Sequence, residues 1–226
     1  MDGTFRQPPL QARSDIARWM TIAFVAAAVV ALLVLAVVGH DERGTDDALI
    51  VTARLSFVLF WLAYTGSALA TLFGPRFQPI KRRGREFGLA FASAHTVHIA
   101  LVAWLCWIGA APVIGVFIFF GIALIFMYLL ALASIGAVRR VLGQVGWRVL
   151  QVVGMNYIAY AFAVDFFKPE RYHSLKFIVA YLPFAALSVI GPALVVAALV
   201  QRAARAWGPA LPAVMPHAIR RGSHKS

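Results

Sequence analysis

The stretch VIGVFIFFGIALIFMYLLALA, residues 113–133, contains no charged side chain. A helix that crosses the hydrocarbon core of a bilayer needs about 20 apolar residues, because each residue adds about 1.5 Å of rise. Other runs of similar length and composition lie on both sides of this stretch. We therefore predict six membrane-spanning helices, at residues 17–39, 48–73, 86–109, 112–138, 148–167 and 176–201.

The composition supports the same class. Hydrophobic residues make up 62% of the 226 residues and charged residues only 13%, and the mean hydropathy is +0.80. A soluble domain could not cover so much apolar surface with so few charges. The apolar runs are unbroken rather than alternating, which favours helices over the strands of a membrane barrel. The sequence thus predicts an all-α integral membrane protein, built as a bundle of six transmembrane helices.

The net charge of +12 is distributed unevenly along the chain. Three segments are strongly basic: 74–86, 139–148 and the end after residue 201. The segment between the first two runs is acidic, and only the mildly basic segment between the last two runs disagrees with the pattern. By the positive-inside rule, both termini lie in the cytoplasm, as an even number of spans requires. We expect a bacterial-type inner membrane, with the lipid bilayer rather than nucleic acid as the partner of the basic residues.

A single transmembrane domain, residues 17–201, accounts for most of the chain. Residues 1–16 and 202–226 are predicted to be cytoplasmic tails, disordered or lying on the surface. The first run is too long for a typical signal-peptide core, so we expect a retained helix. No glycine-rich dinucleotide or phosphate-binding motif occurs, so no flavin or nicotinamide site is expected. The one cysteine, Cys106, excludes an intramolecular disulfide.

Polar residues inside the predicted spans are costly to bury and are therefore functional candidates. They are Arg54, His95, His98, Gln151, Asn156 and Asp165. His95 and His98 are three residues apart, which places them on one helix face. They either hydrogen-bond between helices or contact a ligand, a metal or a cofactor. With Gln151 and Asn156 they could also line a polar site for a metal ion, a quinone or protons, although two histidines supply only part of a metal's ligand set.

Arg54 and Asp165 are both predicted near the end of the bundle that carries the acidic segment between the first two runs. This placement leaves two interpretations of Arg54. It either forms an ion pair with Asp165, or its side chain extends to the membrane interface.

Two segments together resemble the ferric reductase-like transmembrane domain family. They are RRGREFGLAFASAHTVHIA, residues 82–100, and LGQVGWRVLQVVGMNYIAY, residues 142–160. The preceding ARLSFVLFWLAYTGSALATLFGP, residues 53–75, is also consistent with the family's second helix. The family includes ferric reductases, the membrane half of NADPH oxidases and the haem-binding subunit of a bacterial methionine sulfoxide reductase. The resemblance implies a six-helix bundle with both ends inside and with haem bound between helices.

The resemblance also implies positions for the haem ligands. Counted from Gly88 and Leu89, a ligating histidine falls on His98, and Trp147 and Arg148 match the opening of the family's fifth helix. The other expected histidines are missing, because their positions fall on Gln151, on Val164, and on Ala111 or Pro112. The family's usual pair of bis-histidine haems is therefore not expected in this chain.

One haem b remains as an expectation, with His95, His98 and Met155 as the haem-binding candidates. His95 and His98 project from the same side of one helix, so they cannot hold one iron from opposite faces. Met155 lies four residues after Gln151, and its thioether could oppose His98. Ligation by His98 alone is the other option.

Two functions follow from the resemblance. The first is a transmembrane electron-transfer subunit of the oxidoreductase type, which would need a separate reductase. The second is a family member that has lost its cofactor and serves as a structural or regulatory partner in a membrane complex. The sequence leaves open whether the chain is an enzyme.

Overall fold

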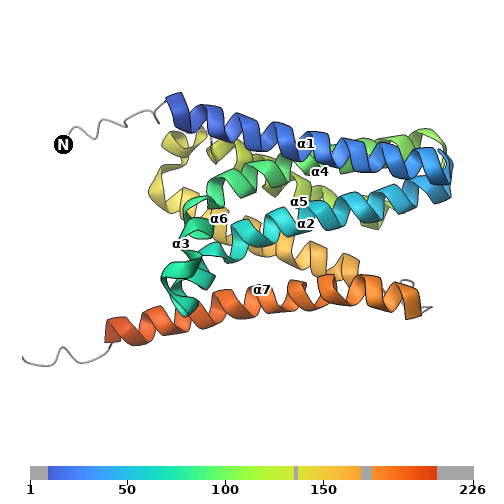
Figure 1. Cartoon of the computed structure of the whole chain (residues 1–226). Helices are drawn as coiled ribbons and strands as arrows, with labels where there is room; N and C mark the ends of the chain where they lie inside the picture. The colour runs from blue at the N-terminus through green and yellow to red at the C-terminus, as the bar shows by residue number, and fades with distance from the viewer. Residues whose placement is uncertain (1–9, 135–136, 169–174, 208–226) are drawn as a thin grey trace, which may run out of the picture.

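The computed structural model describes residues 10–134, 137–168 and 175–207, and every element in these ranges is helical (Figure 1). The long helices are α1 (Leu10–Val38), α2 (Glu42–Phe73), α4 (Gly84–Trp107), α5 (Ile114–Ser134), α6 (Ala137–Phe166) and α7 (Leu175–Trp207). Two short elements, η1 (Pro75–Phe77) and α3 (Gln78–Arg82), join α2 to α4. Six helices are long and apolar enough to cross a membrane. The structure thus confirms the predicted number and kind of spans within the described residues.

Four helices, α1, α2, α6 and α7, are longer than the predicted spans, whereas α5 ends at Ser134 and α6 begins at Ala137, inside the span predicted at 112–138. α1 begins at Leu10, so part of the predicted N-terminal tail is helical, and α7 continues to Trp207 beyond the predicted end of its span. The remaining parts of both predicted tails, residues 1–9 and 208–226, lie outside the described residues. Hydropathy marks only the part of a helix that suits hydrocarbon, because a charged residue at a helix end can reach water. Helix ends depend on capping instead: the Asp41 side chain accepts a hydrogen bond from the Gly44 amide (3.0 Å) at the start of α2.

The basic segments between the predicted spans are largely helical. Gly74 (φ +83°) ends α2, and Pro75 and Pro79 then open η1 and α3. The second basic segment forms the first turns of α6, up to a break at Gly143 (φ +67°, ψ −178°). This backbone conformation is essentially restricted to glycine, so the break is fixed by the residue itself.

Small residues allow α1, α2 and α4 to pack closely. Their contact surface is a cluster of buried alanines, with Val97 and Leu101 of α4 beside them. The alanines are Ala23, Ala27 and Ala31 of α1, Ala48 of α2, and Ala90 and Ala94 of α4. Side chains without bulk let helix backbones approach one another in a membrane, where dispersion contacts hold helices together.

α5 and α6 form a second closely packed pair. A Cβ atom added to Gly154 of α6 would lie 3.1 Å from a Leu130 side-chain atom and 3.2 Å from a Phe126 side-chain atom of α5. The glycine therefore permits this approach. α5 also contacts α4, but it packs more extensively against α6. α7 packs against α2 and α6.

Aromatic side chains fill the space between these groups of helices. The Phe57 ring of α2 lies 5.1 Å from Phe162 and 4.9 Å from Phe166 of α6, between ring centroids. Phe60 of α2 lies 5.3 Å from Phe91 of α4. These rings, with Tyr181 of α7, belong to one buried cluster, which forms the core of the bundle.

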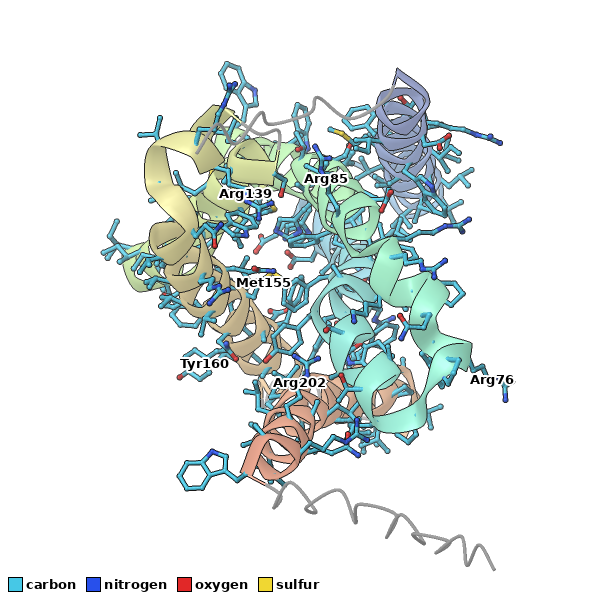
Figure 2. The ribbon with its side chains drawn as sticks, turned by 90° about the vertical axis from the view of Figure 1, so that its left-hand side faces the viewer. Arg76, Arg85, Arg139, Met155, Tyr160 and Arg202 are labelled. Atoms are coloured by element: carbon cyan, nitrogen blue, oxygen red, sulfur yellow. The ribbon has the colours of Figure 1, made fainter. Side chains whose placement is uncertain are left out.

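The basic segments meet at one end of the molecule. Figure 1 places the starts of α1 and α6, the short α3, and the end of α7 at the same end. Figure 2 looks onto this end and shows Arg76, Arg85, Arg139 and Arg202 around it. We call it the basic end. The acidic start of α2 lies at the opposite end (Figure 1).

Candidate functional site

His95 and His98 lie near the middle of α4 and stack on one another. Their ring centroids are 4.7 Å apart, with an angle of 14° between the ring planes. The pair thus shares one helix face, as the spacing predicts.

His98 is linked to α2 through Thr52. The His98 Nδ1 atom lies 3.1 Å from the Thr52 hydroxyl oxygen, and the Thr52 side chain is fully buried. The Thr52 hydroxyl donates to the Ala48 carbonyl within α2 (2.8 Å), so it is free to accept from Nδ1–H. This arrangement favours the tautomer of His98 that carries its proton on Nδ1. One member of the pair therefore bonds between helices.

His95 faces the aromatic core. Its ring lies 5.5 Å from Phe91 and 6.1 Å from Phe162, between centroids, and the Phe162 contact is edge-on. Its Nδ1 atom is buried and has no hydrogen-bond partner among the described residues. The buried Ser56 hydroxyl also lacks a partner there. The ring that meets this histidine from α6 thus belongs to phenylalanine, which cannot ligate a metal.

Arg54 and Asp165 do not form the ion pair that the sequence suggested. The Arg54 guanidinium carbon lies 4.3 Å above the centre of the Tyr181 ring and 5.4 Å from that of Phe184, both on α7. The Asp165 carboxylate accepts a hydrogen bond from the Lys168 ammonium group (2.7 Å). Arg54 therefore contacts aromatic rings of α7 rather than the Asp165 carboxylate.

Gln151 and Asn156 are exposed on α6. The Asn156 side-chain oxygen accepts from the Tyr64 hydroxyl of α2 (2.8 Å), and its amide nitrogen donates to the Val152 carbonyl (2.7 Å). Neither residue takes the place beside His95 that Phe162 fills. The described residues also contain no group of three or more histidine, cysteine, aspartate or glutamate side chains that could hold a metal ion. The arrangement therefore gives no support to a shared polar site of these residues with the histidines.

Met155 is a poor match for a haem ligand opposite His98. It precedes Phe162, the α6 residue beside His95, by seven residues, which is about 10 Å along a helix axis. Axial ligands must face one iron atom from opposite sides. α6 begins at the basic end (Figure 1), so Met155 lies nearer that end than Phe162. Its side chain lies on the inner side of α6 (Figure 2) and packs against the aromatic cluster. The residues present do not fit a haem held between His98 and Met155.

Two cavities stand out on the described part of the chain, and neither is lined by a histidine. The first, of about 380 Å³, lies between α1 and the start of α4. It is lined by Asp15, Arg18, Trp19, Ile22, Arg83 and Glu86. The second, of about 360 Å³, is a groove between α6 and α7. It is lined by Asn156, Ala159, Tyr160, Ala163, Ser188, Val189 and Pro192.

Sequence reasoning missed both cavities, because each depends on how side chains of two different helices pack against one another. The only signals were local ones. Trp19 beside Arg18 is typical of a membrane interface, and the prolines of α7 indicate an irregular helix surface.

Comparison of the chain with protein-family models, with curated proteins and with solved structures gives no match. The resemblance to the ferric reductase-like domain therefore depends on the sequence segments quoted above.

Proposed function

We propose that this protein is a haem-free membrane subunit that serves as a structural or regulatory partner of another membrane protein. The packing of Phe162 against His95 carries the proposal. A porphyrin beside the histidine pair would need the space that this ring fills, and Phe162 is only 7% exposed. Electron transfer through a single haem with a separate reductase is the alternative that the resemblance implies, and Met155, the second ligand considered for it, lies about 10 Å along α6 from the residue beside His95.

The proposed setting is a bacterial-type inner membrane with both termini in the cytoplasm. The gathering of basic residues at one end of the bundle supports this orientation, because positive charge is retained on the cytoplasmic side of a membrane.

The absorption spectrum tests the haem-free state. We expect the full chain, purified after expression with added haem, to show no Soret band. The outcome that overturns the proposal is stoichiometric haem whose Soret band disappears in His98→Ala. His40→Ala serves as the matched control, because His40 is an exposed histidine outside the candidate site.

The groove between α6 and α7 offers a contact surface that suits a helix of a partner protein. Ala159, Ala163 and Ser188 line it with small side chains, which permit close approach of a helix. Asn156 lines the same groove and is exposed. Its amide nitrogen carries two hydrogens, and only the Val152 carbonyl accepts from it among the described residues. A lipid chain offers no acceptor for the other hydrogen, whereas a polar side chain or carbonyl of a partner helix does.

Site-specific photo-cross-linking in native membranes tests this surface. A photoreactive residue in place of Tyr160, which is 58% exposed in the groove, should give one protein adduct of defined mass. The same residue in place of Leu32, 65% exposed on α1, should give lipid adducts only.

Ala159→Leu should fill the groove and abolish the Tyr160 adduct. Lipid adducts alone from both positions would contradict the partner role. An adduct of twice the chain mass would show that the groove contacts a second copy of this chain rather than another protein. That result would likewise overturn the proposal.

A further inference from the structure

We propose that the cavity between α1 and α4 binds the headgroup of a zwitterionic phospholipid that carries a phosphate and a primary ammonium group. The relevant chemistry is that of phosphoethanolamine, presented by a membrane lipid. The inference does not depend on the proposed function, because the cavity lies away from the histidine pair and from the α6–α7 groove.

The charges around the cavity are balanced but not paired with each other. Two cationic side chains, Arg18 and Arg83, and two anionic ones, Asp15 and Glu86, line it. The ion pair between Lys168 and Asp165 is the one formed within the described residues, so no ion pair joins the four charges of the cavity. Guanidinium groups bind phosphate through several hydrogen bonds, and carboxylates accept from ammonium groups. The four side chains thus match a guest that carries both charges.

Glu86 supplies an independent indication of a missing donor. Its Oε2 atom is buried and has no hydrogen-bond partner among the described residues. A buried acceptor without a donor is unfavourable, and more so when it is charged. A primary ammonium group in the cavity would supply donors to this carboxylate, which can turn about its terminal torsion to meet it.

The walls of the cavity suit a lipid rather than a small soluble ion. The Trp19 ring lies 5.6 Å from Phe87 in an edge-on contact, and the Ile22 side chain is 53% exposed on α1. Tryptophan is favoured at the boundary between headgroups and acyl chains. Ile22 lies one turn further into the apolar part of α1, so an acyl chain could continue along it. A volume of about 380 Å³ falls in the range of ligand sites, about 300–1,000 Å³.

The ammonium group decides which lipid should bind best. An ethanolamine headgroup has N–H donors for Glu86, whereas a choline headgroup has none and a glycerol headgroup has no positive charge. Phosphate contacts with Arg18 and Arg83 are common to all three. The cavity should therefore discriminate among lipids through its carboxylates.

Native mass spectrometry of the full-length protein in detergent tests the proposal. Phosphatidylethanolamine, phosphatidylcholine and phosphatidylglycerol with identical acyl chains are added separately. We expect phosphatidylethanolamine to bind about tenfold more tightly than phosphatidylcholine, which is the effect of one charge-assisted hydrogen bond. Glu86→Gln should remove this preference, and Arg83→Gln should weaken the binding of all three lipids. Arg82→Gln is the matched control, because Arg82 is an exposed neighbour that does not line the cavity.

Asp15→Asn provides a second variant at an exposed position, in case Glu86→Gln does not fold, and it should reduce the same preference. Soluble phosphoethanolamine should compete only weakly with the lipid. Three results would each overturn the proposal. The first is equal binding of ethanolamine and choline lipids, and the second is a preference for ethanolamine that is unchanged in both carboxylate variants. The third is competition by soluble phosphoethanolamine that is as strong as competition by the lipid. If phosphatidylglycerol bound most tightly, non-specific attraction of an anionic lipid to the basic end would explain the binding. That result would overturn the proposal as well.

Discussion

At the residue scale, two of the polar side chains inside the bundle contact neighbouring helices. His98 contacts Thr52 of α2, and Arg54 lies over Tyr181 of α7. The sequence showed which residues had to find partners, since lone polar groups are unfavourable in hydrocarbon. It could not show which partners, because a charge can be accommodated by an aromatic ring as well as by an opposite charge.

The link between His98 and Thr52 predicts a measurable stability difference. Thr52→Val keeps the side-chain shape and removes the hydroxyl, so it should lower the free energy of unfolding by about 1 kcal/mol. Thermal unfolding in detergent measures the change. Thr65→Val is the matched control, because among the described residues the buried Thr65 hydroxyl bonds only to the Trp61 carbonyl of its own helix, and its effect should be smaller. If both substitutions lowered the free energy of unfolding equally, the stabilising role of the bond between Thr52 and His98 would be contradicted.

The position of Arg54 predicts coupling to an aromatic ring and not to an acid. In a double-mutant cycle, Arg54→Gln and Tyr181→Leu should be non-additive by about 0.5–2 kcal/mol, the range for a cation over an aromatic ring. Arg54→Gln and Asp165→Asn should be additive, since the Asp165 carboxylate bonds to Lys168. Chemical denaturation of the purified variants measures both cycles. Coupling of Arg54 to Asp165 but not to Tyr181 would contradict the ring contact and would support an ion pair between Arg54 and Asp165.

At the element scale, α6 determines what can lie beside the histidines. Its Gly154 lets it approach α5, while its Phe162 fills the space next to His95. Sequence comparison with the ferric reductase-like pattern located Gln151 at the expected ligand position, but the structure leaves Gln151 exposed. Rotation of a helix about its axis decides which side chain faces the core, and that rotation is set by packing against neighbours.

The break in α6 should depend on glycine. Gly143→Ala places a side chain at φ +67° and ψ −178°, where non-glycine residues cost about 1–3 kcal/mol. We expect a lower thermal midpoint. Gly121→Ala is the control, since Gly121 lies within α5 and a Cβ atom there meets nothing within 4 Å. It should be neutral or stabilising by about 0.5–1 kcal/mol. If Gly121→Ala lowered the thermal midpoint as much as Gly143→Ala, the proposed dependence of the α6 break on glycine would be wrong.

At the scale of the whole molecule, the fold separates charge between its two ends. Basic residues from η1, α4, α6 and α7 lie at one end (Figure 2), and α2 starts with acidic residues at the other. A large difference in positive charge orients a bundle during insertion. Both cavities also arise at this scale, since each lies between two helices.

The charge separation predicts the orientation of the bundle in the membrane. In a Cys106→Ala background, a membrane-impermeant maleimide should label Glu42→Cys in intact spheroplasts. It should label Arg76→Cys only after lysis, because Arg76 lies at the basic end (Figure 2). The opposite labelling pattern would place the termini outside.

The sequence by itself determined the class of the protein, the number of its spans and the sharing of one face by His95 and His98. These features depend on runs of apolar residues and on helical periodicity, which are local properties of the chain. Only the tertiary structure decided that Phe162 adjoins His95, that Tyr181 adjoins Arg54, and that four charged residues enclose a cavity. Those outcomes depend on how helices distant in sequence rotate and pack against one another, and no local pattern encodes that.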